Sequence, residues 1–448
     1  MNQRFILYAA LVCVATGLGE EGRVVVISPH PSSIRHEFSR AFARWHEQRF
    51  GMPAAVEWRD LGGTADALRF VLSEFAAKPE GIGLDCFFGG GPEPALVLAD
   101  RHLAQAHRLP AADLDGIPQS FNGVEVYDRD HQWYGAALSS FGILQNTRVQ
   151  RLVHLPLARR WEDLADPRLR GWVGAGDPRN SGTMNNMFEA FLQAYGWERG
   201  WQLLTEISGN VTKFDRLSTT TAKEVTLGET AYGFTIDFFG FAQVAVAGRS
   251  NMVFVLPEDF TAISPDGITL LHGAPHPLTA RRFLEFTLGE PGQRLWFLPR
   301  GHPEGARDYS IERMSVRPEF YRRYREVSNI AFSPFDLKQA FVYNAAVARQ
   351  RREVVAALAG ALLVDVHAEL RSAWRAMIRR GLVPAERAEL GRMPVTEAAA
   401  RELAQGGWKG PELRNRKKTE WQSWARAKYR ALARGGAPTV AAATDHAP

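Results

Sequence analysis

The sequence predicts an α/β fold that is arranged as two successive blocks and followed by a helical C-terminal region. Short apolar runs of strand length alternate with amphipathic helical patterns from residue 23 to about residue 91, and Gly-rich joints connect them. A second run of the same kind begins near residue 139. After about residue 325, Ala and Arg become frequent and long helical patterns dominate. With 448 residues, 45% of them hydrophobic, the chain is long enough for more than one domain.

The first block supplies three expected strands, at residues 24–27, 54–58 and 84–88. Between them, apolar side chains recur every three or four positions, which is the spacing of one face of a helix. The loop after each strand should therefore lie at the carboxyl edge of the sheet, where open α/β sheets bind ligands. Cys86 falls in the third strand, and we expect it to pack in the core.

The second block repeats this pattern. An extended run at residues 133–138 leads into it, and further strands are expected at residues 172–176 and 231–237. Residues 253–257 form an expected strand that crosses back to the first block, and residues 277–288 form an amphipathic helix.

The first residues are typical of a signal peptide. Arg4 supplies a basic start, residues 5–14 are apolar, and Ala15-Thr16-Gly17 offers small residues for cleavage. The apolar run is shorter than the roughly 20 residues that a membrane-spanning helix needs. We therefore expect residues 1–20 to be removed and the protein to reach the periplasm. Retention of this segment as a membrane anchor is the alternative.

The net charge of +5 is concentrated at the C-terminal end. Residues 401–448 contain ten Lys and Arg against four Asp and Glu, so the rest of the chain is close to neutral. This distribution argues against nucleic-acid binding by the whole protein. The last expected helix, about residues 417–433, carries an apolar stripe with Trp421, Trp424, Tyr429 and Leu432. Two interpretations stay open: the stripe packs on the body, or the basic helix lies on anionic lipid or on an importer.

Four stretches of the sequence carry a family resemblance. They are Trp133-Tyr134-Gly135 through Asn146-Thr147, Trp161-Glu162-Asp163-Leu164 through Ser181-Gly182-Thr183, Gly228-Glu229 through Ile236-Asp237, and Pro265-Asp266-Gly267-Ile268 through Gln293. On these motifs, residues 23–305 resemble the type II periplasmic substrate-binding proteins of ABC importers, in the branch that serves ferric iron, thiamine, 2-aminoethylphosphonate and spermidine-like solutes. The helical C-terminal third has no counterpart in the minimal fold of that family.

The resemblance implies two α/β lobes that are joined by crossing strands and close around a solute by hinge motion. Lobe 1 should comprise residues 23–138 and 253–325, and lobe 2 should comprise residues 139–252. Residues 326–435 are expected as a helical extension, and 436–448 as a disordered tail. The implied partners are a small solute and the permease subunits of an ABC transporter. The receptor is expected to be a monomer.

The loops at the strand ends supply the candidate ligand contacts. Lobe 2 offers Ser181, Gly182 and Thr183 between a strand and a helix, where N–H groups and the helix dipole favour an anion. An ordinary helix cap is the alternative interpretation. The candidates in lobe 1 are Ser28, His30, Gly62, Gly63, Thr64 and Gly90, and Ser139 is a further candidate at the start of lobe 2.

Asp237-Phe238-Phe239 bears on the identity of the ligand. The resemblance implies neighbouring tyrosinates in this loop of ferric-binding relatives, and Phe has no oxygen that could bind iron. Asp237 could instead bind an amine, with Phe238 stacking on it, and a structural cap is the alternative. We therefore expect a cationic or zwitterionic organic solute that can carry phosphate, of the thiamine or aminophosphonate kind. Ferric iron is the alternative ligand.

Catalysis is not indicated by any motif. The scattered histidines show no metal-ligand spacing, and the Gly-x-Ser-x-Gly motif of a secreted α/β hydrolase does not occur. We therefore expect a binding protein with no catalytic residue, no metal site and no cofactor. The remaining alternative is a periplasmic sensor or scaffold that uses the same two-lobed fold and signals through the added helices.

Overall fold

The computed structural model describes residues 22–216, 218–330, 332–336, 341–408 and 410–436. The expected signal peptide, residues 1–20, and residues 437–448 of the expected tail lie outside these ranges. The chain divides into two compact units. Unit 1 comprises Met1–Ser139 and Ile263–Lys338, and unit 2 comprises Ser140–Ala262 and Gln339–Pro448.

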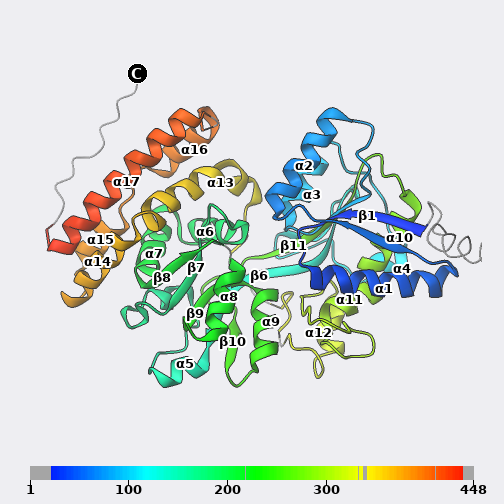
Figure 1. Ribbon diagram of the computed structural model, residues 1–448, viewed down its shortest axis with the longest axis horizontal. Helices are drawn as coiled ribbons and strands as arrows, with labels where there is room; N and C mark the ends of the chain where they lie inside the picture. Colours follow the sequence, from blue (N-terminus) through cyan, green and yellow to red (C-terminus); the bar gives the residue numbers. More distant parts are fainter. Residues whose placement is uncertain (1–21, 217, 331, 337–340, 409, 437–448) are drawn as a thin grey trace, which may run out of the picture. The chain divides into compact units, whose positions relative to one another are not determined.

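Unit 1 is built on a mixed sheet with the strand order β2-β1-β3-β11, to which the first half of β6 is added (Figure 1). β1 pairs in parallel with β2 and β3, and β11 runs antiparallel to β3. A separate two-stranded hairpin is formed by β4 and β5. In chain order the elements are β1 (Arg23–Ile27), α1 (Ser32–Phe50), β2 (Ala55–Arg59), α2 (Thr64–Ala77), β3 (Cys86–Phe88), α3 (Pro92–Asp100), α4 (Ala111–Leu114), β4 (Ser120–Phe121), β5 (Val124–Glu125), the start of β6 (Tyr134–Asn146), β11 (Ile263–Leu270), α10 (Pro277–Leu288), α11 (Glu290–Phe297) and α12 (Pro318–Arg323).

Helices cover both faces of this sheet because successive strand residues point to opposite sides. Val25 and Ile27 of β1 belong to a buried cluster with side chains of α2 and α3. On the other face, Phe88 of β3 packs edge-on against Phe38 of α1, with ring centroids 5.4 Å apart. As expected, Cys86 is buried in this sheet, and burial raises the pKa of its thiol.

Unit 2 contains a second sheet, formed by β10, the second half of β6, β9, β7 and β8. β7 pairs in parallel with β8 and β9, whereas β6 runs antiparallel to β9 and β10. The elements up to residue 262 are the end of β6, α5 (Thr147–Leu152), the short 3-10 helices Trp161–Ala165 and Pro167–Leu169, β7 (Val173–Gly176), α6 (Gly182–Tyr195), α7 (Trp197–Asn210), β8 (Val211–Asp215), α8 (Ser218–Leu227), β9 (Tyr232–Ile236), α9 (Asp237–Ala247) and β10 (Met252–Val255).

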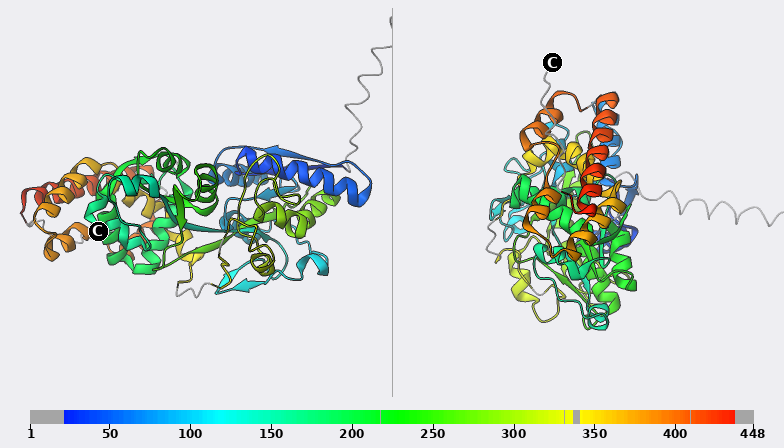
Figure 2. Two further views of the ribbon diagram at one scale, coloured as in Figure 1. Left: turned by 90° about the horizontal axis from the view of Figure 1, so that it is seen from below. Right: turned by 90° about the vertical axis from the view of Figure 1, so that its left-hand side faces the viewer.

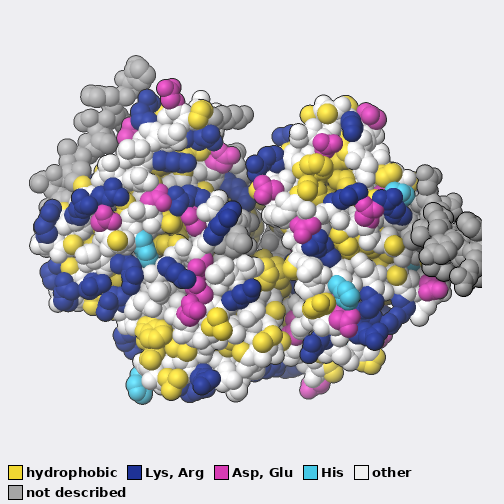
Figure 3. All heavy atoms as spheres, viewed as in Figure 1, with side chains coloured by type: hydrophobic (Ala, Val, Ile, Leu, Met, Phe, Trp, Pro, Cys, Tyr) yellow, Lys and Arg dark blue, Asp and Glu magenta, His cyan; other side chains and the backbone are white. Residues whose placement is uncertain are grey.

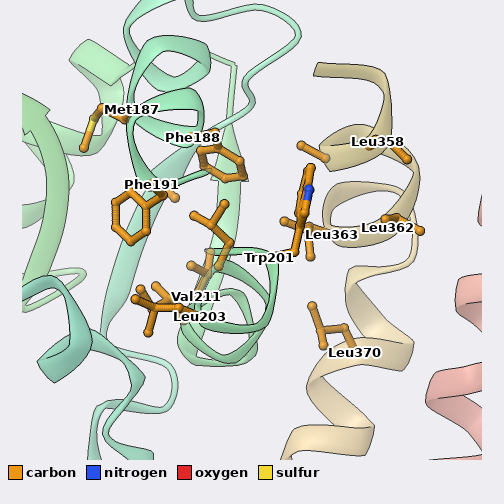
Figure 4. Close-up of a cluster of buried hydrophobic side chains, with 14 of the residues drawn as sticks. Met187, Phe188, Phe191, Trp201, Leu203, Val211, Leu358, Leu362, Leu363 and Leu370 are labelled. Carbon is orange, nitrogen blue, oxygen red and sulfur yellow. The ribbon is translucent and has the colours of Figure 1, made fainter. Parts of the chain in front are cut away.

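The C-terminal helices are part of unit 2, and we call them the extension. They are α13 (Ala345–Ala359), a π-helical turn (Gly360–Val364), α14 (His367–Arg379), α15 (Pro384–Gly391), α16 (Glu397–Gly406) and α17 (Pro411–Arg434). One buried cluster combines side chains of α6 and α7 with side chains of α13, α14 and α17. In Figure 4, Phe188 and Trp201 face Leu358, Leu362 and Leu363 of the extension. The long helix α17 lies along α14 (Figure 2).

The unit boundaries differ from the expected lobes, chiefly at two places. β10 pairs with the end of β6, Val255 opposite Ile143, and therefore stays in unit 2, so the chain returns to unit 1 only at Ile263. The extension was expected as a separate segment, but it shares the hydrophobic core of unit 2. None of the helices in the described ranges combines the length and the hydropathy that crossing a membrane requires.

Candidate functional site

In unit 1 the candidate residues gather at the carboxyl edge of the parallel strands. Ser28 and His30 follow β1, Thr64 begins α2 after β2, and Gly90 follows β3. A Cβ on Gly90 would lie 2.8 Å from Oγ1 of Thr64, and a Cβ on Gly89 would lie 2.5 Å from the His30 ring. The three loops are therefore in direct contact, as their place at one sheet edge predicts.

Gly62 and Gly63 form the turn into α2. Gly62 has a φ of +90°, and its N–H donates to Oδ1 of Asp60 at 3.0 Å. The same carboxylate is paired with Arg35 at 2.7 Å, which fixes the turn. Gly63 occupies the N-cap position without a side-chain cap, so its turn exposes the backbone N–H groups that begin α2.

His30 is held inside unit 1 by contacts to both ring nitrogens. Its Nδ1 lies 3.0 Å from Ser28 Oγ, and its Nε2 lies 2.8 Å from Asp266 and 3.0 Å from Nη1 of Arg313. Arg313 also donates to Asp266 at 2.5 Å and to Ser139 Oγ. Each of these five residues is at most 6% exposed, so they form one buried polar network.

The charges in this network follow from burial and pairing. Burial lowers the pKa of His30 and therefore favours the neutral ring. Burial alone would raise the pKa of Asp266, but Arg313 and His30 hold it well below its usual range. Asp266 and Arg313 therefore form a buried ion pair. Neither partner was expected from the sequence, because both are distant from the β1 loop along the chain.

In unit 2, Ser181, Gly182 and Thr183 open α6 as expected. Ser181 is the N-cap, and its Oγ accepts the N–H of Met184 at 3.3 Å. Its own N–H donates to the carbonyl of Asp177 at 2.9 Å, which ties the loop to the end of β7. Gly182 is exposed and Thr183 is half-buried, so this first turn presents backbone N–H groups that have no intrahelical acceptor.

Two arginines that were not expected from the sequence approach this turn. Arg179 donates to the carboxylate of Asp177 through Nε and Nη2, at 3.0 and 2.7 Å. Its Nη1 pairs with Asp365 at 2.9 Å. The hydrogen bonds to Asp177 raise the pKa of Arg179. Arg352 of α13 places Nη2 only 3.3 Å from the position of a Cβ on Gly182. The sequence shows two adjacent arginines at residues 351–352, but no local pattern indicates that α13 lies against α6.

Asp237 and Phe238 follow β9 at the same sheet edge. Asp237 is fully buried at the start of α9, and Phe238 packs against Phe239 with ring centroids 4.4 Å apart. Tyr232 of β9 is fully buried and its hydroxyl donates to the carbonyl of Pro156. Burial raises the pKa of Tyr232, which disfavours the phenolate that iron would need.

One group of side chains in unit 1 has the spacing of metal ligands. His36, Glu37 and Asp308 lie close enough to share an ion. The buried carboxylate of Glu37, however, already accepts three backbone N–H groups of residues 307–309 and a guanidinium bond from Arg40. These donors occupy the oxygens that a metal would use.

The arrangement in unit 2 suits an anion. The positive end of the α6 dipole, the N–H groups of its first turn and the Arg352 guanidinium converge on one loop. The carboxylate of Asp177 is already neutralised by Arg179 and does not oppose an anion there. A phosphate or carboxylate group is the chemistry that this donor set can bind.

Comparison with known proteins bears on the family. Residues 99–310 match the family model described as Bacterial extracellular solute-binding protein. The match includes segments of both units and ends before the extension.

One similar protein covers most of the chain. The chain is 26% identical over 401 residues to the "Phosphoglycerate transport regulatory protein PgtC" of Salmonella typhimurium, covering 86% of this chain and 92% of that protein. The 14% that is left out is about 63 of the 448 residues, fewer than the 110 residues of 339–448. The alignment therefore includes part of the extension.

Solved structures share the fold. The periplasmic binding protein AfuA from Actinobacillus pleuropneumoniae, with fructose-6-phosphate bound, has a TM-score of 0.52 and 19% identity, covering 69% of this chain and all of that one. The apo ferric ion-binding protein A of Pasteurella haemolytica has a TM-score of 0.54 and 17% identity, covering 79% and 98%. The expected type II periplasmic binding fold is thereby confirmed. The matching family and both structures are binding proteins rather than enzymes, in agreement with the expectation.

Proposed function

We propose that this chain is a receptor for a small organic phosphate, since residues 99–310 match the family model described as Bacterial extracellular solute-binding protein. The observation that carries the proposal is the convergence of the α6 N-terminus and Arg352 on the Ser181 loop. The receptor would act as a monomer and hand its solute to the permease subunits of an ABC importer.

This proposal narrows the class of solute expected from the sequence. The phosphate part of that expectation has a matching donor set in unit 2, whereas the amine part rested on Asp237, which is fully buried. Two similar proteins also point to phosphate esters, since their names refer to phosphoglycerate and fructose-6-phosphate. Ser28, His30, Gly62, Gly63, Thr64, Gly90 and Ser139 stay predicted contacts, although His30 and Ser139 already have partners within unit 1.

A thermal-shift screen tests the solute class. A ligand that binds only the folded protein stabilises it by about 2.7 kcal/mol at a hundredfold excess over its Kd. We expect phosphoglycerates or sugar phosphates to raise the melting temperature, and thiamine without phosphate, polyamines and ferric citrate to leave it unchanged. A shift with thiamine or a polyamine, and none with any phosphate ester, would contradict the proposal.

Iron binding should be weak. Phe238 and Phe239 stand where the resemblance implies tyrosinates, and the hydroxyl of Tyr232 is turned to Pro156 inside the core. We expect no visible charge-transfer band when the purified protein is mixed with ferric citrate. A red colour that the Tyr232→Phe variant loses would show that iron is the ligand.

A second candidate function is that of a solute sensor. The observation that favours it is the similarity to a transport regulatory protein over a region that includes part of the extension. A sensor would use the same solute site but pass its occupancy to another protein instead of delivering the solute. Genes for a permease and an ATPase beside this gene would favour import, and solute uptake that continues normally after deletion of this gene would favour the sensor.

A further inference from the structure

The three most exposed large hydrophobic side chains of the described residues all belong to unit 2. They are Leu152, Leu227 and Val246, with exposed fractions of 69%, 76% and 79%, and the next is Val342 at 52%. Single exposed apolar side chains are ordinary on a protein surface. Several that protrude together, next to polar groups, mark a surface that another body covers.

The topology of unit 2 brings these three side chains to one edge of its sheet. Leu227 ends α8 shortly before β9 begins, and β6 runs antiparallel to β9, so α5 with its last residue, Leu152, lies at the edge where β9 begins. Val246 lies in the last turn of α9, which leads into β10, and Met252 of β10 pairs with Asn146 directly before α5. All three helix ends therefore meet at the same edge of the sheet.

Contacts between the three helices hold this edge together. A Cβ on Gly228, directly after α8, would lie 3.1 Å from Val149 of α5. Arg151 of α5 donates to the carbonyl of Ser250, which follows α9, at 3.2 Å, and α8 and α9 pack against each other. Figure 3 shows both hydrophobic and basic side chains around α5. We call this surface the apolar edge, and its members are Leu152, Leu227 and Val246.

Basic side chains accompany the apolar edge. Arg148 lies four positions before Leu152 on α5, so the two share one helix face, and Lys223 lies four positions before Leu227 on α8 in the same way. The exposed charged residues of the segments 147–152, 223–229 and 245–250 are Arg148, Arg151, Lys223, Arg249 and Glu229. The apolar edge therefore lies in a positively charged surface.

We propose that the apolar edge rests on an anionic lipid surface, with its three side chains among the lipid headgroups and with Arg148 and Lys223 on the lipid phosphates. Protruding apolar side chains beside basic ones suit such a surface, because negatively charged headgroups lie directly above a hydrocarbon layer. A second copy of the chain suits it less, since a symmetric contact would place one positive edge against another.

Contact at this edge keeps the solute loop of unit 2 away from the lipid. The Ser181 loop follows the carboxyl end of β7, and β7 runs parallel to β9. The apolar edge lies where β9 begins, which is the opposite edge of the same sheet. A receptor that is held on a membrane in this way therefore does not cover that loop.

Vesicle co-sedimentation of the protein purified after export tests the proposal. The probes are vesicles of equal parts of phosphatidylcholine and phosphatidylglycerol, and vesicles of phosphatidylcholine alone. We expect the protein to bind the anionic vesicles and not the neutral ones. Binding should weaken strongly between about 0.1 M and about 1 M NaCl, where the Debye length falls from about 10 to about 3 Å.

A triple variant with a matched control locates the contact. Leu152→Ser, Leu227→Ser and Val246→Ser together should weaken binding to anionic vesicles at least about tenfold, because the side chains that enter the lipid are gone. Both proteins should melt like the unchanged protein, since the substituted side chains are exposed. If the triple variant melts lower, Leu227→Ser alone takes its place. The control changes exposed side chains of the same types in unit 1 and should bind like the unchanged protein; it carries Leu61→Ser, Leu278→Ser and Val327→Ser.

The charges are tested separately. Arg148→Gln with Lys223→Gln should weaken binding to anionic vesicles about fivefold per charge. The proposal is wrong if the unchanged protein does not bind anionic vesicles at about 0.1 M NaCl, or if the triple variant binds them as well as the unit 1 control does. Sedimentation velocity detects the other occupant: a dimer that the triple variant loses, without any vesicle binding, would show that a second copy covers the apolar edge.

Discussion

A chain that ends at Gly410 should be far less stable than the full-length protein. The truncation removes α17, whose Trp421, Ala425, Tyr429 and Leu432 are at most 3% exposed. Burial of each large apolar side chain stabilises the fold by about 1.5 to 3 kcal/mol, and a whole domain is stable by only about 5 to 15 kcal/mol. We therefore expect the melting temperature of unit 2 to fall by many degrees.

The contacts of this helix explain why the loss is large. Trp421 stacks on Trp408 with ring centroids 5.6 Å apart, and the hydroxyl of Tyr429 donates to the carbonyl of Leu362 at 3.0 Å. The apolar stripe of the last helix therefore packs on unit 2, which is one of the two interpretations left open by the sequence. On this view the truncated protein sediments with anionic liposomes no less than the full-length protein does.

If the truncated chain does not fold, single substitutions on α17 test the same contacts. Tyr429→Ala should cost about 3 to 5 kcal/mol, as aromatic truncations in a core do. Arg430→Ala on the same helix removes only an exposed pairing with Glu369, at 3.3 Å, and should cost less than about 1 kcal/mol. Unchanged melting of the truncated protein, together with loss of salt-sensitive liposome binding, would mean that α17 acts at a membrane surface instead. Solute affinity per folded molecule should survive, since Arg352 is retained.

The surface of the extension is strongly basic. Residues 341–436 contain nineteen Lys and Arg against nine Asp and Glu, and Figure 3 shows many of these side chains over α14 and α17. Some of these basic side chains form ion pairs, such as Arg426 with Glu369 at 2.8 Å and Arg387 with Glu206 at 2.7 Å. Part of this positive charge is therefore paired within unit 2, by carboxylates of the body and of the extension.

The alternation of strands and helices could be predicted because its signal is local. The apolar run at 24–27 became β1, and the run at 84–88 contains β3. The place of the extension could not be predicted, because an apolar stripe shows that a helix is buried but not against what. Trp374 of α14 packs directly on Gly209, because a Cβ on Gly209 would lie only 2.4 Å from the Trp374 ring. The Nε1 of Trp374 donates to Oδ1 of Asn210 at 2.7 Å. Such a contact joins parts of the chain that share no local pattern.

The candidate site divides in the same way. Ser181, Gly182 and Thr183 could be found because hydroxyl and glycine residues between a strand and a helix are typical of a helix start. Arg352 could not be found, since its role depends on α13 lying against α6. His30 could be named as a candidate contact because it follows β1. Its neighbours Asp266 and Arg313 come from the second chain segment of unit 1 and could not be predicted from the sequence.

Lys428 of α17 should make the stability of the protein depend on pH. Its side chain is 1% exposed, and Nζ donates to the carbonyls of Leu390 and Arg392 at 2.7 and 2.9 Å. The amine also lies 4.6 Å from the centre of the Trp424 ring. Burial lowers its pKa from 10.5 to about 7, although nearby Glu389 opposes the shift. A neutral amine keeps two N–H groups, which suffice for the two carbonyls.

The sign of the effect follows from the proton balance. Below pH 7 the lysine is charged in both the folded and the unfolded chain, and the stability from this group is at its lowest. Between pH 7 and 10.5 the unfolded chain holds the proton that the folded chain has released, so the free energy of unfolding rises with pH. Each pKa unit corresponds to about 1.36 kcal/mol, so this group should add roughly 2 kcal/mol between pH 7.5 and pH 9.5.

Urea denaturation of the unchanged protein and of Lys428→Met at pH 6, 7.5 and 9.5 measures this effect. The absolute stability of the variant also reflects two carbonyls left without a donor, so the quantity to compare is the change of the difference with pH. The free energy of unfolding of the unchanged protein should rise relative to that of Lys428→Met as the pH rises above 7. Below pH 7 the difference between the two proteins should not change with pH. Lys418→Met, on the same helix but partly exposed, is the matched control for the loss of a lysine. A difference between the unchanged protein and Lys428→Met that stays constant from pH 6 to 9.5 would mean that Lys428 keeps an ordinary pKa in the folded protein.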